Sequence, residues 1–266
     1  MTDPAVKTNP LWVAYEFLGM LAVIWVFCFI SFCWMPFAFL FRFILPKRPG
    51  ALVGRWVIMW AFRIYLRSLT LLFPIRLDFH ELDQLAAEGP LIIAANHPSL
   101  LDAVLICSRL PNAVCVMKAA LMDNLVFGVG ARLAGYIRNN APLAMILNAR
   151  EALQDGAHLV IFPEGTRTEK FPLNPCSASI GLIASRTGIP VQTVLIDYSN
   201  RYLCKGWPLT KRPSLPLRGT VRLGKRFEPG RDAALFTSEM ENYFRAELSE
   251  KSQNPSCTVA FSSQVP

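Results

Sequence analysis

From Phe17 to Phe41 the chain has 25 consecutive residues without a charged side chain, and most of them are apolar. A helix of this length extends about 37 Å, more than the roughly 30 Å of a bilayer's hydrocarbon core. Pro36 lies within the run and is expected to kink or end the helix. Two arrangements remain open: a helix that spans the membrane, or a helical hairpin seated in one leaflet. A cleaved signal peptide is disfavoured because the run is too long and its leader has no positive excess.

The composition supports contact with a membrane. Hydrophobic residues make up 53% of the 266 residues and charged residues 17%, against roughly 45–50% and about 25% in an average soluble domain. The formal net charge is +8, and no acidic residue but seven basic residues lie between Glu16 and Asp78. These cations alternate with Trp, Phe and Leu, which favours an anionic bilayer surface over a nucleic acid. If the apolar run spans, the basic residues after it place the remainder in the cytoplasm, so we expect the active domain on the cytoplasmic face of the inner membrane.

A second apolar segment follows a Pro- and Gly-rich boundary at residues 46–50. Between Ala51 and Phe73, Arg55, Arg63 and Arg67 fall within an arc of about 120° on a helix. The opposite face carries Trp and other large apolar residues, so the pattern predicts an interfacial amphipathic helix. A soluble helix with a solvated cationic face is the alternative. Residues 1–73 are thus expected to form a membrane anchor with an interfacial helix.

From residue 74 onward, short strand-like and helix-like segments alternate. This pattern predicts an α/β domain over residues 74–250, with a mixed sheet flanked by helices. The expected helices lie near 98–109, 142–155, 176–187 and 232–250. The expected strands are Ile75–Phe79, Leu91–Ala95, Ala113–Met117, His158–Phe162, Val191–Asp197 and Thr220–Leu223. Residues 251–266 are rich in Ser, Gln and Pro and are expected to be a disordered tail.

The stretch AANHPSLLDA places a histidine directly after a predicted buried strand. Pro98 is expected to be the first residue of the next helix, where its missing N–H costs nothing. Within one helix a five-residue step would separate His97 and Asp102 by about 140°. Because His97 lies before the helix, its ring can fold back toward Asp102, which would fix its tautomer and make it a stronger base. The spacing fits a general-base pair, although a histidine that only caps the helix has the same spacing.

A second motif, HLVIFPEGTRT at residues 158–168, is a short apolar strand followed by a compact turn. The turn brings a carboxylate, backbone N–H groups and a guanidinium to the end of the strand. Its glycine permits close approach of the backbone, and arginine offers a planar fork for phosphate. An ordinary turn has little use for this combination.

Together the two motifs resemble those of the lysophospholipid acyltransferase family, also called the glycerolipid acyltransferases. Asn96, His97 and Asp102 match the family's first motif, and residues 162–167 match Phe-Pro-Glu-Gly-Thr-Arg without change. The resemblance covers about residues 75–225. It implies a one-step transfer of a fatty acyl group from a thioester to a glycerol hydroxyl, without an acyl-enzyme.

In that reaction, the resemblance implies that His97 takes the proton of the hydroxyl and that Asp102 supports the imidazolium. The residues expected to bind the acceptor are Lys118, Arg138, Glu164, Gly165, Thr166 and Arg167. The expected donor is acyl-CoA or an acyl-carrier protein, acting as co-substrate, and no other cofactor is expected. Membrane lipids are the other expected partners, and no histidine pair has the spacing of a metal site, so no metal is expected.

Two departures from the family pattern concern the acceptor. In GYIRNN, Arg138 follows Gly135 by three residues rather than about six, and Gln192 and Thr193 stand where the family has Val and Pro. The leading acceptor is 1-acylglycerol-3-phosphate, which would give phosphatidic acid. An O-acyltransferase of an ornithine lipid or aryl polyene pathway remains open. A hydrolase that uses the same pair on water and a non-catalytic membrane-binding protein also remain open.

Overall fold

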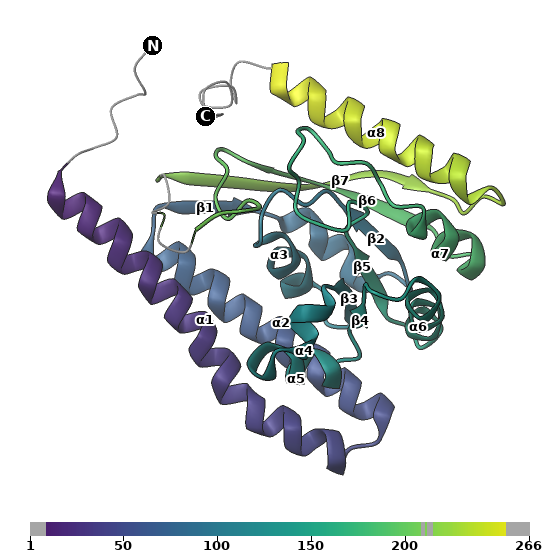
Figure 1. Cartoon of the computed structure of the whole chain (residues 1–266), viewed down its shortest axis with the longest axis horizontal. Coiled ribbons are helices and arrows are strands. Elements are labelled where there is room, and N and C mark those ends of the chain that lie inside the picture. The colour runs from purple at the N-terminus through teal and green to yellow at the C-terminus, as the bar shows by residue number, and fades with distance from the viewer. Residues whose placement is uncertain (1–8, 209–210, 212–214, 254–266) are drawn as a thin grey trace.

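The computed structural model describes residues 9–208, 211 and 215–253 (Figure 1). Its centre is a seven-stranded mixed sheet in the order β1-β7-β6-β2-β5-β3-β4. The predicted fold class is confirmed. The strands are β1 (Ile75–Asp78), β2 (Ile92–Ala95), β3 (Ala113–Met117), β4 (Ile137–Arg138), β5 (His158–Ile161), β6 (Val191–Tyr198) and β7 (Leu217–Phe227).

Five strands of the sheet are parallel and end at the same edge, which we call the carboxyl edge. β2 lies between β5 and β6 and is parallel to both, and β3 is parallel to β5 and β4. β7 runs antiparallel to β6, and β1 is parallel to β7. All four residues of β2 are buried, as expected for a central strand covered on both faces. The loops after β2, β3, β4, β5 and β6 therefore meet at the carboxyl edge, where open α/β sheets place their ligands.

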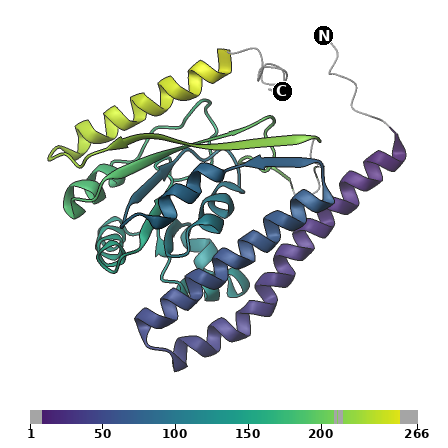
Figure 2. The same cartoon turned by 180° about the vertical axis from the view of Figure 1, so that it is seen from behind.

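Helices cover both faces of the sheet and divide the core in two (Figures 1 and 2). One face packs against a 3-10 helix, η1 (His80–Ala87), α2 (Lys47–Leu72) and α3 (Asp102–Arg109). The other face packs against α6 (Pro142–Gln154), α7 (Ser179–Thr187) and α8 (Ala233–Gln253). Two short helices, α4 (Ala119–Asp123) and α5 (Leu125–Leu133), lie between β3 and β4 in the chain.

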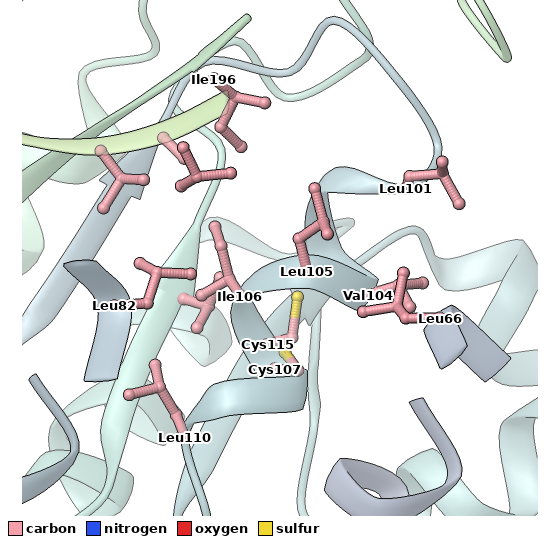
Figure 3. Close-up of a cluster of buried hydrophobic side chains, with 14 of the residues drawn as sticks. Leu66, Leu82, Leu101, Val104, Leu105, Ile106, Cys107, Leu110, Cys115 and Ile196 are labelled. Carbon is pink, nitrogen blue, oxygen red and sulfur yellow. The ribbon is translucent and has the colours of Figure 1, made fainter. Parts of the chain in front are cut away.

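The short helix α3 is held by the larger of the two core clusters. Figure 3 shows side chains of α3, including Leu105 and Ile106, directed toward Leu82 of η1 and Ile196 of β6. Leu105 and Ile106 are both almost fully buried. This packing fixes the position of α3, and with it the position of Asp102 at the helix's first residue.

The N-terminal segment is a helical hairpin. α1 (Pro10–Ile44) and α2 run side by side, joined only by Leu45 and Pro46 (Figures 1 and 2). The expectation that Pro36 ends the helix is wrong, because α1 continues through Pro36 to Ile44. Within the described ranges, α1 is the helix that is long and apolar enough to cross a membrane, and only 11% of its most apolar 18-residue window is buried.

Two of the three arginines in the basic stripe that the sequence predicts on α2 contact protein groups, and the third, Arg67, is exposed. Arg55 is buried, and its guanidinium donates to the Ala134 carbonyl and to Asn112. Arg63 donates to the carbonyl of Ser108 at the end of α3. Apolar side chains of α2, including Trp56 and Ile64, are also exposed. Helical periodicity does not reveal the contacts of Arg55 and Arg63, because the carbonyls that they bind lie at the ends of other helices.

Most predicted element boundaries are within two residues of the observed ones. β7 is longer than predicted, and α4, α5 and the two-residue β4 were not predicted. α3 starts at Asp102 rather than at Pro98. The helix α8 extends to Gln253, and the rest of the expected tail, residues 254–266, lies outside the described residues.

Candidate active site

The predicted site residues lie on loops that leave the carboxyl edge of the sheet. His97 follows β2, Lys118 follows β3, and the turn that contains Glu164 follows β5. Arg138 is the last residue of β4. Parallel pairing thus brings together residues that are far apart in the sequence.

His97 and Asp102 are in direct contact, as the spacing predicts. The His97 Nδ1 atom is 2.8 Å from Asp102 Oδ2. The reason differs in part from the prediction, because residues 98–101 form a bend and turn rather than helix. The N–H of Ser99 donates to the same Asp102 oxygen, and the N–H of Leu100 donates to the Leu203 carbonyl. These two bonds hold the turn that lets His97 fold back onto the first residue of α3.

The carboxylate of Asp102 is fully buried and is surrounded by donors. His97 and the Ser99 N–H contact Oδ2, and the hydroxyl of Tyr198 donates to Oδ1 at 2.9 Å. Burial raises the pKa of Asp102 above its ordinary value, while the bonds from His97, Ser99 and Tyr198 act to lower it. Because the three donors stabilise the ionised form, the site can hold a carboxylate that orients the imidazole.

The orientation of the His97 ring is fixed from a second side. The ring stacks on Phe162, with centroids 4.0 Å apart and an angle of 19° between the planes. Since Nδ1 is used by Asp102, Nε2 is the nitrogen left for a substrate. The side chain is 17% exposed. The geometry therefore suits a neutral imidazole that donates from Nδ1 and accepts a proton at Nε2.

The turn after β5 is attached to the histidine loop through Glu164. Gly165 has a φ of +67°, a conformation that glycine adopts without strain, and its N–H closes the turn on the Phe162 carbonyl. The Glu164 carboxylate accepts from the His97 N–H at 2.8 Å, from the Thr168 hydroxyl and from the Asn174 N–H. Burial raises the pKa of Glu164, and these three bonds oppose the rise. Glu164 thus contacts protein groups on both its oxygens.

Arg167 links the same turn to the loop between β6 and β7. Its Nη1 atom donates to the carbonyls of Leu203 and Cys204 at 2.9 and 2.8 Å. Leu203 has a φ of 54°, which is uncommon for a residue other than glycine. Its carbonyl also accepts the Leu100 N–H, so the unusual conformation serves two contacts at the site.

The other predicted acceptor-binding residues are more exposed. Lys118 is exposed at the start of α4, and Thr166 is half-buried beside Gly165. Arg138 forms a two-bond ion pair with Asp123, with distances of 2.6 and 2.9 Å. This pair raises the pKa of Arg138 and lowers that of Asp123, through their mutual hydrogen bonds. One edge of the Arg138 fork is therefore occupied by a protein carboxylate.

Comparisons with known proteins agree with the two motifs. Residues 76–197 match the family model described as Acyltransferase. The chain is 32% identical over 123 residues to a putative 1-acyl-sn-glycerol-3-phosphate acyltransferase of Caenorhabditis elegans, covering 43% of this chain and 44% of that protein. The match therefore spans less than half the length of this relative. Over residues 76–197, slightly less than half of its length, the chain is similar to the acyltransferase family.

Two further proteins show longer matches. A lyso-ornithine lipid O-acyltransferase of Rhizobium meliloti is 29% identical over 227 residues, covering 80% of this chain and 70% of that protein. The crystal structure of PlsC, the 1-acyl-sn-glycerophosphate acyltransferase of Thermotoga maritima, superposes with a TM-score of 0.66 at 20% identity, covering 90% of this chain and 98% of that one. The match to PlsC shows the fold.

Several residues that build this site are not indicated by the sequence motifs. Tyr198, Thr168 and Asn174 contact Asp102 or Glu164. Tyr198 carries a recognisable signal, because it is a polar residue at the end of a buried strand that reaches the carboxyl edge. Thr168 and Asn174 carry none, since each lies in an irregular loop.

Gln192 and Thr193, which depart from the family pattern, lie away from the site. They are near the start of β6, and their side chains bond to backbone carbonyls of β7. They pair with Ile93 and Ala94 of β2, whereas Tyr198 lies at the other end of β6. Among the residues that the structure describes, no group of three or more His, Cys, Asp or Glu side chains is arranged to hold a metal ion.

Proposed function

We propose that this protein is a membrane-associated O-acyltransferase that moves a fatty acyl group from a thioester to the free hydroxyl of a lysolipid. The observation that carries the proposal is the pair formed by His97 and Asp102, whose carboxylate is buried and whose imidazole keeps one nitrogen open at the carboxyl edge. The match of residues 76–197 to the family model described as Acyltransferase supports the reaction class.

In the proposed reaction, the acceptor hydroxyl oxygen attacks the carbonyl carbon of the thioester. Its proton passes to His97 Nε2 as the new C–O bond forms. The C–S bond then breaks, and the thiolate of the donor takes the proton from the imidazolium. Asp102 stabilises the imidazolium between these steps, and general-base help of this kind contributes about 10²–10⁴ in rate.

Two of the motif residues act in this proposal by positioning the pair. Glu164 holds the backbone N–H of His97, and Arg167 holds the loop whose Leu203 carbonyl fixes Leu100. The Nε and Nη2 groups of Arg167 can still bind an acceptor headgroup, as can Lys118. Such fixed geometry matters because small displacements of a catalytic base reduce the rate strongly.

The leading acceptor is a lysophospholipid, 1-acylglycerol-3-phosphate, because the site presents Lys118 and Arg167 and because the nematode relative is named for that substrate. A lyso-ornithine lipid is the second candidate. It is favoured by the match to the Rhizobium meliloti protein over 80% of the chain. It is also favoured by the Arg138–Asp123 pair, since a carboxylate beside the acceptor cations suits a headgroup that carries an ammonium.

We also propose that the α1–α2 hairpin lies in one leaflet and does not span the membrane. The turn end of the hairpin is tied to the α/β domain, because Lys47 pairs with Glu151 and Arg48 pairs with Asp155 of the α6 segment. At its other end, the hydroxyl of Tyr15 donates to the Leu72 carbonyl at the end of α2. A spanning α1 would carry α2, with its exposed Arg67, into the hydrocarbon core unless the two helices separated.

The decisive test replaces His97 by Ala. The purified variant is assayed with lysolipid acceptors and with acyl-CoA and acyl-carrier protein as donors, and products are identified by mass. We expect acyl transfer to fall by at least about 10²-fold while flotation with vesicles is unchanged. His80→Ala is the matched control, because His80 also contacts an aspartate, Asp78 at 2.6 Å, but is exposed and outside the site.

The same assay separates the alternatives. Retained turnover in the His97→Ala variant would refute the mechanism. Release of fatty acid without any lysolipid would indicate a hydrolase. Acylation of lyso-ornithine lipid in preference to 1-acylglycerol-3-phosphate would select the second acceptor.

A further inference from the structure

Tyr198 is the last residue of β6 and extends the hydrogen-bond network of the proposed catalytic pair by one member. Its hydroxyl donates to Asp102 Oδ1 at 2.9 Å, whereas His97 and the Ser99 N–H both use Oδ2. Each carboxylate oxygen therefore has its own donors. Tyr198 is 5% exposed and Asp102 is 0% exposed, so water does not compete for this bond.

The surroundings of Asp102 show why this bond matters. The groups that face its carboxylate are His97 from the loop after β2, the N–H of Ser99 from the same loop, and Tyr198 from β6. The hydroxyl of Ser99 donates to the carbonyl of Tyr202. No Lys or Arg bonds to Asp102 within the described part of the chain, so the three donors carry the stabilisation of its charge.

Tyr198 is suited to a permanent donor role. Burial and the nearby Asp102 carboxylate raise the pKa of Tyr198 well above its ordinary value. The phenol therefore keeps its proton at any working pH and can only donate toward the carboxylate. A hydrogen bond to a buried charge contributes more than a bond between neutral groups.

We propose that Tyr198 is a positioning residue of the acyl-transfer site, which stabilises the ionised carboxylate of Asp102 and thereby sets the proton affinity of the His97–Asp102 pair. The proposal rests on the proposed function, because it assumes that the pair is the general base. Tyr198 acts through Asp102 and does not touch the substrate.

The direction of its effect follows from electrostatics. Without the phenol, Oδ1 is left with no described donor in a buried position, so the negative charge becomes less stable. The pair then binds a proton more tightly, whether the proton resides on the imidazole or on the carboxylate. Since the protonated pair cannot act as a base, activity should disappear at a higher pH than in the wild type.

The test is Tyr198→Phe, which keeps the ring and removes the hydroxyl. We expect the acid limb of the kcat/KM profile to move to higher pH by about one unit, because the loss of a hydrogen bond to a charge is of this size. The acceptor KM should stay within about twofold, since no substrate contact is lost. Tyr243→Phe is the matched control, because its hydroxyl also makes a hydrogen bond, from the Lys225 N–H, but lies away from the site.

A second substitution keeps the proposal testable if Tyr198→Phe folds poorly. Site-specific 3-fluorotyrosine at position 198 preserves the shape and is a stronger donor, so the acid limb should move to lower pH. An unchanged acid limb in either folded Tyr198 variant would overturn the proposal, as would an equal shift in Tyr243→Phe. Absence of transfer by the wild type would instead refute the proposed function, so the two failures are distinguishable.

Discussion

At the scale of single residues, the contacts of the buried Glu164 differ from the role in acceptor binding that its motif suggests. The turn after β5 offers Glu164 as a candidate ligand for the acceptor, but its oxygens are occupied by His97, Thr168 and Asn174. A carboxylate that accepts three hydrogen bonds from protein groups fixes the loop after β2 against the loop after β5. Its contribution to activity is therefore expected to run through the position of His97.

Replacing Glu164 by Gln tests this role. The amide keeps one acceptor oxygen and places an N–H₂ group against a protein donor, which costs about 1–3 kcal/mol. We expect a lower midpoint of thermal unfolding and a turnover reduced by at least about tenfold as His97 shifts. Glu169→Gln is the control, because Glu169 is an exposed partner of Lys205 and such surface pairs contribute about 0–1 kcal/mol. Equal effects of the two substitutions would contradict the role of Glu164 in fixing the position of His97.

His158 supplies a pH-dependent contribution to stability outside the site. It is buried at the start of β5, and its Nδ1 has no hydrogen-bond partner among the residues that the structure describes. Burial lowers the pKa of His158 below its ordinary value of 6.5, partly offset by Glu88. The unfolded chain therefore takes up this proton first, so stability is full above pH 6.5 and falls as the pH drops through the lower folded-state pKa.

The measurement is the free energy of unfolding in urea at several pH values, for the wild type and for His158→Leu. The variant should lack the part of the acid destabilisation that begins near pH 6.5. His80→Leu should change the dependence in the opposite sense, because its bond to Asp78 raises the pKa of His80, so stability from that pair is present below pH 6.5 and lost as the pH rises. Identical pH profiles of wild type and His158→Leu would exclude the effect.

At the scale of elements, the close packing of α2 against the segment after α5 depends on one glycine. A Cβ atom on Gly54 would lie 2.9 Å from the backbone nitrogen of Ala134, whereas the nearest atoms to a Cβ on Gly50 would be two side-chain atoms at 3.4 Å. Arg55, the next residue, donates to the Ala134 carbonyl. The two glycines lie one helical turn apart and form a matched pair.

Gly54→Ala should push α2 away from Ala134 and lengthen the Arg55 bond, at a cost of about 1–3 kcal/mol. Gly50→Ala should be neutral or stabilising, because alanine favours a helix by up to about 1 kcal/mol over glycine. Thermal unfolding in detergent measures the difference. Equal melting temperatures of the two variants would show that α2 does not pack as described.

The elements also show what could be predicted from the sequence. Strand positions were predictable because buried parallel strands are short apolar runs, and the contact between His97 and Asp102 was predictable from a five-residue step across a helix start. The start of α3 was not, since the bonds that hold residues 98–101 out of the helix come from Asp102 and the distant Leu203. β4 was missed because two residues carry no periodicity, and Tyr198 because its partner is 96 residues away.

At the scale of the whole molecule, the hairpin presents a large apolar surface. The outward face of α1 exposes large apolar side chains, among them Trp25 at 63% and Phe43 at 73%. An apolar recess of about 450 Å³ lies between α1 and the start of α5, lined by Phe29, Phe32 and Phe127 among others. Water is a poor solvent for such a surface, which favours insertion of the hairpin into a membrane.

The orientation of the hairpin decides on which side of the membrane the chain begins. If α1 and α2 enter and leave one leaflet, reporters fused before Met1 and after Pro266 should be active in the same compartment of the producing cell. If α1 spans, the two reporters should lie in different compartments. We expect the same compartment, because Tyr15 near the start of α1 donates to the Leu72 carbonyl at the end of α2, directly before the α/β domain.

A matched control fusion shows the signal that the assay gives when one reporter has crossed the membrane. An unrelated spanning helix placed between the N-terminal reporter and α1 should move that reporter across the membrane and leave the C-terminal one where it was. Charge reversal at both Lys47 and Arg48 should loosen the turn end without reversing the topology, since the apolar face of α1 stays intact. Opposite compartments for the two reporters on the unaltered chain would mean that the contact between Tyr15 and Leu72 is lost on insertion and that α1 crosses the bilayer.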